Sequence, residues 1–324
     1  MNTSVEPPVR RGVYCVLSSR SLPYARHAMA SLAAHSIEDL DLTLITDSAA
    51  DKTALVEAMA ALAIPDRHRW RVAAQAEADD LAADRLSGHP NIAAFRFGHP
   101  CWRKVTDPML FAPPGAEMVI LDPDLYFPNR FRFEPTPREG LLLMRQRPHC
   151  LLPHEVVVRA YEQGFRLAHH TDIGVSQVRN RLDLDFLDTL IARIGGTTLP
   201  RAMHVESIVW AALAMHMGGG YLDPEHWHCW GNSQWNRVLR RFGASGRTVL
   251  RSERFAAMKC FHGGGIAKWW VPEALAAGDL PPPGELLEAR PPLPYEELTR
   301  DGYEATQRLK SWARRAGYYR LVKS

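Results

Sequence analysis

The sequence predicts an α/β fold in which a mixed, mostly parallel sheet carries helices on both faces. Short apolar runs of strand length alternate with longer stretches of helix-forming residues, as at 13–17, 23–35, 42–46 and 51–63. Strands that alternate with helices are typical of parallel sheets whose connections cover both faces. Of the 324 residues, 46% are hydrophobic and 23% are charged, which suits one large globular domain.

The first half of the chain contains two strand–helix units and one further helix. Pro23 opens the first helix, and Pro65 stops the second. The third helix is predicted because its residues are rich in alanine, the strongest helix former. The expected strands are 13–17 and 42–46, and the expected helices are 23–35, 51–63 and 72–86.

The second half is less regular, and its last part is set off by prolines. The expected helices are 103–111, 154–163 and 205–217, and the expected strands are 118–121, 141–144, 172–178, 221–223 and 258–261. Residues 276–294 carry most of a proline-rich run, which predicts a linker. We therefore expect a main domain over 1–275, a linker over 276–294 and a helical appendage over 295–324.

The charge and the cysteines restrict the class of protein. A net charge of +3 is too small to indicate nucleic acid as the main partner. The five cysteines are scattered, without a C-x-x-C pair, and predict free thiols in a reducing compartment. No apolar run approaches the roughly 20 residues that a membrane span needs. The expectation is a cytoplasmic protein.

The C-terminal stretch mixes cations with aromatic side chains. The mixture consists of Arg308, Lys310, Trp312, Arg314, Arg315, Tyr318, Tyr319, Arg320 and Lys323. On a helix, this composition suits the surface of an anionic membrane, so peripheral contact at the inner face of the membrane is one expectation. The alternative is a terminal helix packed on the body with a solvated basic face.

Two aspartates follow the most apolar strand of the chain. Asp122 and Asp124 come directly after the run at 118–121 and lie two residues apart, so both point to the same side. Paired carboxylates of this kind bind hard divalent cations, and the cation can bind a diphosphate. Asp-x-Asp also occurs at 39–41 and 183–185, so the pattern alone is weak. The buried strand in front of Asp122 distinguishes it from the others.

A late histidine is a candidate third ligand. His262 ends a predicted strand and begins a glycine-rich turn, in which the backbone can approach a ligand closely. Its neutral imidazole can bind a cation that two carboxylates already hold. Lys268, six residues later, can reach a phosphate oxygen as a point charge. Ser18 and Asp47 also follow predicted strands, and with Asp122 they are expected at one edge of the sheet.

These motifs, taken in order, resemble those of the GT-A glycosyltransferases. A first strand leads into a serine loop and helix, a later strand ends in Asp-x-Asp, and His-x-Gly-x-x-x-Lys-x-Trp follows at 262–270. The resemblance covers about 13–270 and is nearest to the family 8 type, which includes glycogenin and bacterial lipopolysaccharide galactosyltransferases. It implies a Rossmann-like nucleotide-diphospho-sugar transferase fold, and a transfer of sugar from a nucleotide-sugar donor, UDP-linked, to a saccharide or lipid-linked hydroxyl acceptor.

The resemblance also implies a set of site residues. Asp122, Asp124 and His262 would bind a Mn²⁺ or Mg²⁺ ion that bridges the diphosphate. The implied substrate-binding residues are Ser18, Ser19, Lys104, Gly174, Ser207, Gly265, Lys268 and Trp269. The chain departs from the family pattern in four ways: an aspartate is missing from the 18–21 loop, Asp172 replaces an asparagine, Ser207 replaces a glutamine, and no proline separates Lys268 from Trp269.

Two acidic residues are candidates for the chemical step. If the transfer inverts the configuration of the sugar, Glu206 is the candidate base for the acceptor hydroxyl. If it retains the configuration, Glu206 or Asp172 would lie beside the anomeric carbon and stabilise positive charge there. The resemblance favours retention, and the residues themselves do not decide. The donor sugar, the acceptor and the oligomeric state are likewise not specified by the sequence.

Other functions compatible with the sequence remain open. His226, His228 and Cys229 are close in sequence and carry zinc-ligand side chains, which allows a metal-dependent hydrolase. A catalytically inactive protein that binds a nucleotide sugar without consuming it is also allowed, because of the serine at position 207. A sugar nucleotidyltransferase is less well supported, since the loop at 18–21 contains no glycine.

Overall fold

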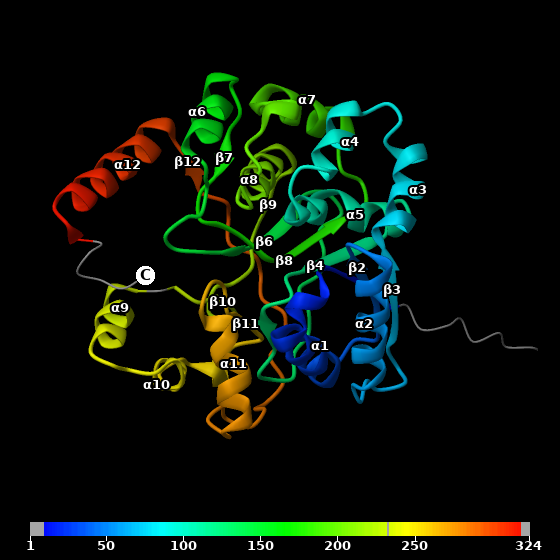
Figure 1. Cartoon of the computed structure of the whole chain (residues 1–324), viewed down its shortest axis with the longest axis vertical. Coiled ribbons are helices and arrows are strands. Elements are labelled where there is room, and N and C mark those ends of the chain that lie inside the picture. The colour runs from blue at the N-terminus through cyan, green and yellow to red at the C-terminus, as the bar shows by residue number, and fades with distance from the viewer. Residues whose placement is uncertain (1–9, 232, 319–324) are drawn as a thin grey trace, which may run out of the picture.

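The computed structural model describes residues 10–231 and 233–318 (Figure 1). Tyr319, Arg320 and Lys323 of the C-terminal stretch lie outside the described residues. The main helices are α1 (Leu22–His35), α2 (Ala49–Ala60), α3 (Gln75–Arg85), α4 (Pro90–Arg96), α5 (Arg103–Phe111), α6 (His154–Glu162), α7 (Leu184–Ile194), α8 (Val205–Met217), α9 (Gln234–Arg241), α10 (Gly246–Leu250), α11 (Ala267–Ala276) and α12 (Arg300–Arg315).

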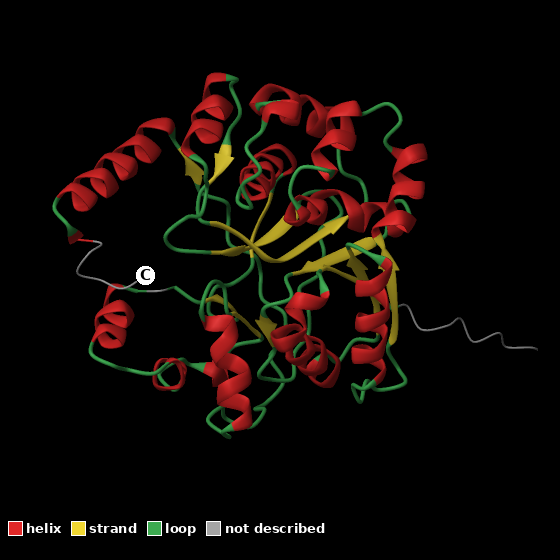
Figure 2. Cartoon of the chain, in the orientation of Figure 1, coloured by secondary structure: helices red, strands yellow, loops and turns green. Residues whose placement is uncertain are grey.

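A ten-stranded sheet runs through the centre of the described chain (Figure 2). Its strands are β1 (Arg11–Val16), β2 (Leu40–Thr46), β3 (Arg69–Ala74), β4 (Glu117–Leu121), β5 (Leu125–Tyr126), β6 (Leu141–Arg145), β8 (Thr171–Arg179), β9 (Gly219–Tyr221), β10 (Trp227–Cys229) and β11 (Cys260–His262). The order is β3-β2-β1-β4-β8-β6-β10-β11-β5, and β9 pairs with β6.

The predicted mixed, mostly parallel sheet is confirmed. β3, β2, β1 and β4 are parallel to one another, as are β6, β10 and β11. β8 lies between these two groups and is antiparallel to both of its neighbours, β4 and β6. The carboxyl ends of the parallel strands therefore meet on one edge, which is where ligands bind in sheets of this kind.

Side-chain alternation in β4 shows why helices are needed on both faces. Met118 and Ile120 belong to one hydrophobic core, whereas Val119 and Leu121 belong to the other. The first core includes helices α3 to α8, and the second includes α1 and α2. Both faces of the sheet are thus buried, which explains why this strand is apolar at every position from 118 to 121.

The predicted helix over 72–86 is wrong in its first part. Residues 69–74 form β3, which pairs with β2 from Asp41↔Arg69 to Thr46↔Ala74, and only 75–85 are helical. Pairing along six positions of a parallel sheet outweighs the helix propensity of the alanines. The helix begins where the side chain of Glu77 accepts a hydrogen bond from the amide of Ala74, at 2.7 Å.

The proline-rich segment packs along the body. Leu287 forms a parallel bridge with Phe131, and Leu293 forms an antiparallel bridge with Tyr221. The chain then forms β12 (Glu297–Leu298), which pairs antiparallel with β7 (Leu167–Ala168) before α12 begins. Within the described residues, none of the helices has the length and apolar character to cross a membrane.

Candidate active site

Asp122, Asp124 and His262 meet at the carboxyl ends of the strands. Asp122 follows β4, and its amide donates to the carbonyl of Gly174 at 2.8 Å. His262 ends β11, which is held beside Asp124 because β11 pairs with β5 and the amide of Gly263 donates to the carbonyl of Asp124 at 3.0 Å. The His262 Nε2 atom lies 3.3 Å from Asp124 Oδ1 and 3.7 Å from Asp122 Oδ2.

The other nitrogen of His262 is held by a fourth side chain. His262 Nδ1 lies 2.9 Å from Oδ1 of Asp172, on β8. Asp172 is itself fixed, because Gly174 donates its amide to Oδ1 at 2.9 Å and the thiol of Cys229 donates to Oδ2 at 3.4 Å. A carboxylate on Nδ1 keeps the proton there, so that Nε2 is the nitrogen available to a metal ion.

Gly174 is required by this arrangement. A Cβ atom at position 174 would lie 2.5 Å from His262 Nδ1, which is closer than real Cβ contacts allow. Only glycine lets the imidazole pass this close to β8. Gly174 was predicted to bind substrate, and the structure places its backbone against the ring of His262.

The charges at this cluster are strongly coupled. Burial alone would lower the pKa of His262, but the carboxylates of Asp172 and Asp124 raise it well above its ordinary value. Burial acts to raise the pKa of Asp124, yet the neighbouring His262 holds it below its usual range. Burial raises the pKa of Asp122, against the opposing effect of Lys104. An imidazolium therefore balances the acids, and a divalent cation would take over this task by displacing its proton.

Lys104 lies on α5 and joins two acidic residues of the site. Its Nζ atom is 2.5 Å from Asp122 Oδ1 and 2.9 Å from Glu206 Oε1. Burial acts to lower the pKa of Lys104, but the two carboxylates raise it well above its ordinary value. Burial raises the pKa of Glu206 to about 8, although Lys104 opposes this. The second oxygen of Glu206 has no hydrogen-bond partner among the described residues.

These side chains line a cleft of about 650 Å³. Among the predicted substrate-binding residues, Ser18, Lys104, Ser207, Gly265 and Lys268 line this cleft, as do the predicted catalytic residues Glu206 and Asp172. Asp47 also lines it, so the expected convergence of Ser18, Asp47 and Asp122 is present in the structure. A volume of this size is sufficient for a nucleotide sugar.

Besides Gly174, two predicted substrate-binding residues are not part of the cleft lining. Ser19 donates its amide to Oδ1 of Asp51 at 3.0 Å, which connects the loop after β1 to the first turn of α2. Trp269 packs edge-on against Tyr24, with ring centroids 5.1 Å apart, and remains about half exposed. Tyr24 lines the cleft and holds the ammonium of Lys268 over its ring, 5.1 Å from the centroid. No sequence pattern pointed to Tyr24, because its contact depends on α1 meeting α11.

The zinc site predicted as an alternative at His226, His228 and Cys229 is not formed. No group of ligand side chains that contains His226 or His228 is present among the described residues. Neighbouring side chains of a strand point to opposite faces. His228 accordingly stacks on Phe261, with ring centroids 6.0 Å apart, whereas Cys229 contacts Asp172 and His262.

The other two Asp-x-Asp pairs have structural contacts. Asp183 caps α7 by accepting a hydrogen bond from the amide of Phe186. Asp39 forms an ion pair with Arg67 at 3.6 Å. Neither pair belongs to a ligand cluster in the described chain, which leaves Asp122 and Asp124 as the pair suited to a cation.

The donor set fits a hard divalent ion. Asp122 and Asp124 offer carboxylate oxygens and His262 an imidazole nitrogen, a combination that suits Mn²⁺ or Mg²⁺. His262 also belongs to a second group with Asp172 and Cys229. Burial raises the pKa of the Cys229 thiol to about 12, so a metal bound by this group would have to displace a tightly held proton.

No family model matches the sequence, and no curated protein matches it. Solved structures do match the fold. Mouse xyloside xylosyltransferase 1 is 14% identical, with a TM-score of 0.47, over 79% of this chain and 98% of that one. The glycosyltransferase GlyE of Streptococcus pneumoniae is 12% identical, with a TM-score of 0.47, and 84% of this chain covers 61% of it. The galactosyltransferase LgtC is 12% identical, with a TM-score of 0.45, over 85% of this chain and 98% of that one.

Proposed function

We propose that this protein is a metal-dependent glycosyltransferase that moves a sugar from a nucleotide-diphosphate donor, UDP-linked, to a hydroxyl acceptor. The observation that carries the proposal is the meeting of Asp122, Asp124 and His262, of which His262 is far from the other two in the sequence, in the lining of a cleft of about 650 Å³. Lys104 and Glu206 line the same cleft beside Asp122, so cationic and acidic groups face the same space.

Asp122, Asp124 and Nε2 of His262 would hold the Mn²⁺ or Mg²⁺ ion. When bound, such an ion neutralises the negative charge that develops on the departing diphosphate. Lys268 lies beside the same cleft, held over Tyr24, and adds a second positive charge for a phosphate oxygen. Groups that act on charge developing in the transition state lower the barrier rather than only tightening binding.

Glu206 is the proposed catalytic residue. In the transfer, the bond between the anomeric carbon and the phosphate oxygen breaks, and its electron pair stays with the diphosphate. The acceptor oxygen forms the new bond and loses its proton, either to Glu206 or to the leaving phosphate. Burial raises the pKa of Glu206 to about 8, so near neutral pH its ionised fraction is the form that accepts this proton. One oxygen of Glu206 has no hydrogen-bond partner among the described residues.

Asp172 is proposed to position His262. Its two oxygens are used by His262, Gly174 and Cys229, which leaves little capacity for direct contact with a sugar. This role follows from the histidine–carboxylate contact, which orients metal-binding imidazoles.

Donor turnover tests the proposal. Purified protein with Mn²⁺ is incubated with a panel of UDP-, GDP-, TDP- and CMP-linked sugars, and release of the nucleotide is measured. We expect slow hydrolysis of a UDP-sugar in the absence of acceptor. Asp124→Ala should reduce the rate of hydrolysis by more than about 100-fold, since the loss of a metal ligand costs more activity than the loss of a residue that orients a ligand. Asp41→Ala is the matched control, because Asp41 belongs to another Asp-x-Asp pair and is exposed.

Binding separates an active transferase from an inactive relative. If UDP binds tightly only with Mn²⁺ but no donor on the panel is consumed, the protein binds nucleotide sugars without catalysis. If neither binding nor turnover depends on Asp124, the proposed site is wrong.

We also propose that α12 contacts an anionic membrane that carries the acceptor. Leu309 and Trp312 are 65% and 68% exposed on this helix, among the cations Arg308, Arg314 and Arg315. Exposed apolar side chains flanked by cations suit the headgroup region. Sedimentation with vesicles of anionic and of neutral lipid tests this: Leu309→Ser with Trp312→Ser should release the protein from anionic vesicles, whereas Phe97→Ser, which removes another exposed apolar side chain, should not.

A further inference from the structure

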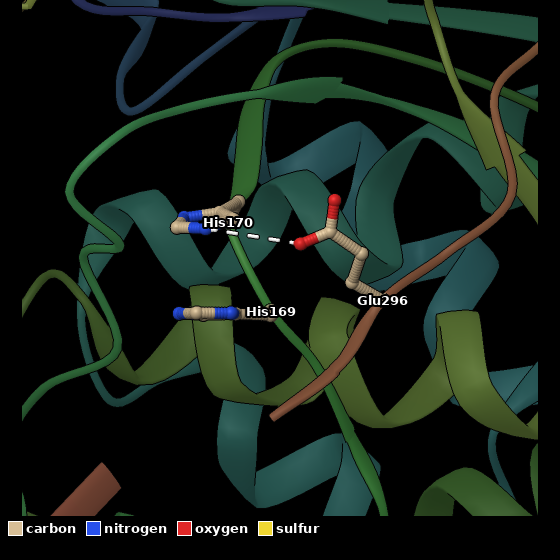
Figure 3. Close-up of side chains that lie close together, drawn as sticks. All are labelled: His169, His170 and Glu296. Carbon is tan, nitrogen blue, oxygen red and sulfur yellow. Dashed lines mark ion pairs between the residues drawn. The ribbon is translucent and has the colours of Figure 1, made fainter. Parts of the chain in front are cut away.

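His169, His170 and Glu296 form a second cluster of metal-ligand side chains, away from the cleft. One ligand atom from each lies within 4.8 Å of the other two. Figure 3 shows both imidazoles on the same side of the chain, with the carboxylate of Glu296 reaching toward His170. The cluster joins the turn between β7 and β8 to the segment just before β12. None of these residues lines the cleft described above.

The backbone is shaped so that both imidazoles face the same space. Consecutive residues in an extended chain point to opposite sides. His170 has a φ of 56°, the left-handed conformation, and this turns its ring onto that of His169. The two rings are stacked, with centroids 3.6 Å apart and planes inclined by 19°. The nitrogen lone pairs lie in the ring planes, so the two rings must tilt apart before both can bind one ion.

Glu296 is held in place by a neighbouring arginine. Its Oε1 atom forms an ion pair with Arg145, and its Oε2 atom faces Nε2 of His170 at 4.0 Å. The guanidinium thus orients the carboxylate, as outer partners of metal ligands do, and leaves the second oxygen free to bind a cation. The amide of His169 donates to the Glu296 carbonyl at 2.7 Å, which fixes the separation of the two segments.

The imidazoles are neutral and incompletely satisfied. Burial lowers the pKa of His170 to about 4, with help from His169 and Arg145, and burial lowers that of His169 as well. Both rings therefore keep a lone pair at neutral pH, which is the form that binds metals. The Nδ1 atom of His170 is buried and has no hydrogen-bond partner in the described structure.

The geometry points to a second metal site, in which His169, His170 and Glu296 bind Zn²⁺ or a similar transition-metal ion. Two nitrogens and one oxygen with an open fourth position are a zinc-type donor set. Ligands of a tetrahedral zinc ion are about 3.3 Å apart, so the 4.0 Å between His170 and Glu296 needs only a small closure. The oxygen-rich cluster at Asp122 and Asp124 prefers harder ions, so the two sites differ in selectivity.

An ion at this site would fasten the C-terminal helix to the body. β12 pairs with β7 through only two residue pairs, and the single fully buried residue of α12 within the described chain is Tyr303. A short strand pair and one anchoring ring leave the attachment of α12 weak. An ion bound by Glu296, His169 and His170 would strengthen this attachment, because a ligand that binds only the folded state stabilises that state.

Zinc binding to the full chain tests the proposal, with any affinity tag removed and metal stripped by a chelator. His262→Gln serves as the background, since His262 is shared by both ligand groups of the cleft. We expect one equivalent of Zn²⁺ to bind, and Co²⁺ in its place to give the visible absorption of a four-coordinate ion. His170→Asn should weaken binding by at least about tenfold. Asparagine tolerates the left-handed conformation of position 170, so the backbone is preserved.

Glu296→Gln is the second variant, and His216→Gln is the matched control. His216 is paired with Asp183 at 3.0 Å, and it belongs to none of the metal-ligand groups among the described residues.

Zinc should also slow tryptic cleavage within α12 by at least about fivefold in the parent chain, and not in His170→Asn. If His262→Gln does not fold, the same variants are compared in the wild-type background as the loss of one equivalent of Zn²⁺. Zinc binding that is absent, or equal in the parent, His170→Asn and Glu296→Gln chains, overturns the proposal.

Discussion

His262 Nδ1 lies 2.9 Å from Asp172 Oδ1, while Nε2 of the same ring faces Asp124 at 3.3 Å. The Asp172 carboxylate therefore orients the imidazole through Nδ1, and the Asp124 carboxylate lies beside the nitrogen that would bind a metal ion, Nε2. This relationship assigns the two acids different tasks, although both contact the same ring. It also makes the orientation of His262 depend on β8, a strand that carries no metal ligand of the proposed site.

Asp172→Asn should weaken Mn²⁺ binding without removing a ligand. The amide keeps the size of the side chain but loses the negative charge that favours a proton on Nδ1 of His262. We expect the dissociation constant for Mn²⁺ to rise by about 10–100-fold. The electron paramagnetic resonance signal of free Mn²⁺ measures this directly. Asp185→Asn is the control, since the side chain of Asp185 is 98% exposed. An unchanged constant in Asp172→Asn would show that the contact does not orient the ring.

Gly174→Ala should displace His262. The added Cβ would lie 2.5 Å from Nδ1 of the imidazole, so either the ring or β8 must move. Overpacking of this kind costs about 1–3 kcal/mol, and here the moving part is a metal ligand. We expect Mn²⁺ binding to be lost while the far-ultraviolet circular dichroism is retained. Gly88→Ala is the matched control, because a Cβ there meets nothing within 4 Å. Retained Mn²⁺ affinity in Gly174→Ala would contradict the packing argument.

The alternation of apolar runs was sufficient to predict the fold class. The predicted strand at 118–121 and the helix at 205–217 correspond to β4 and α8, because the first is a short continuous apolar run and the second is a longer segment with apolar residues at helical spacing. β3 was not predicted, since its residues Arg69 and Arg71 interrupt the apolar pattern and its pairing with β2 is a tertiary effect. Short strands such as β10 also need their neighbours to exist.

The candidate site was predictable only as residue types. The sequence indicated that Asp122, Asp124 and His262 share a cation, and the structure places both carboxylates within 3.7 Å of His262 Nε2. The sequence did not indicate the contact of Lys104 with Asp122 and Glu206. This contact depends on the packing of α5 against the end of β4 and the beginning of α8. The stacking of His169 on His170 likewise depends on one backbone angle that no pattern predicts.

Lys104→Met should destabilise the metal-free protein strongly. The variant leaves Asp122 and Glu206 buried without their shared cation, and breaking a buried ion pair costs about 3–5 kcal/mol. Urea unfolding in the presence of a chelator measures the free energy. Saturating Mn²⁺ should restore part of the loss, because the ion then takes over the charge of Asp122.

Lys52→Met is the matched control for this prediction. Lys52 also contacts a carboxylate, Glu77, at 2.8 Å, but both side chains are more than a third exposed. Exposed pairs contribute only about 0–1 kcal/mol. Equal losses in the two variants would mean that Lys104 does not act as a buried counterion.

Glu206 should make the stability of the metal-free protein fall as pH rises. Its pKa is about 8 in the folded protein, raised by burial from an ordinary value of 4.5. Between these two values the folded state holds a proton that the unfolded state has released, so the unfolding free energy decreases with increasing pH across this window. Glu206→Gln carries no titrating proton and should flatten the profile there.

Urea unfolding with chelator, from about pH 3.5 to about pH 9, gives the difference between the wild type and Glu206→Gln. We expect this difference to change steadily within the window and to level off below pH 4.5 and above pH 8, where both states have the same protonation. Glu225→Gln is the control, since the side chain of Glu225 is 67% exposed and should leave the slope unchanged. Parallel profiles for the wild type and Glu206→Gln would mean that Glu206 is ionised in the folded protein at neutral pH. The pKa of Glu206 would then not be raised by burial, and the carboxylate could accept a proton without first losing one.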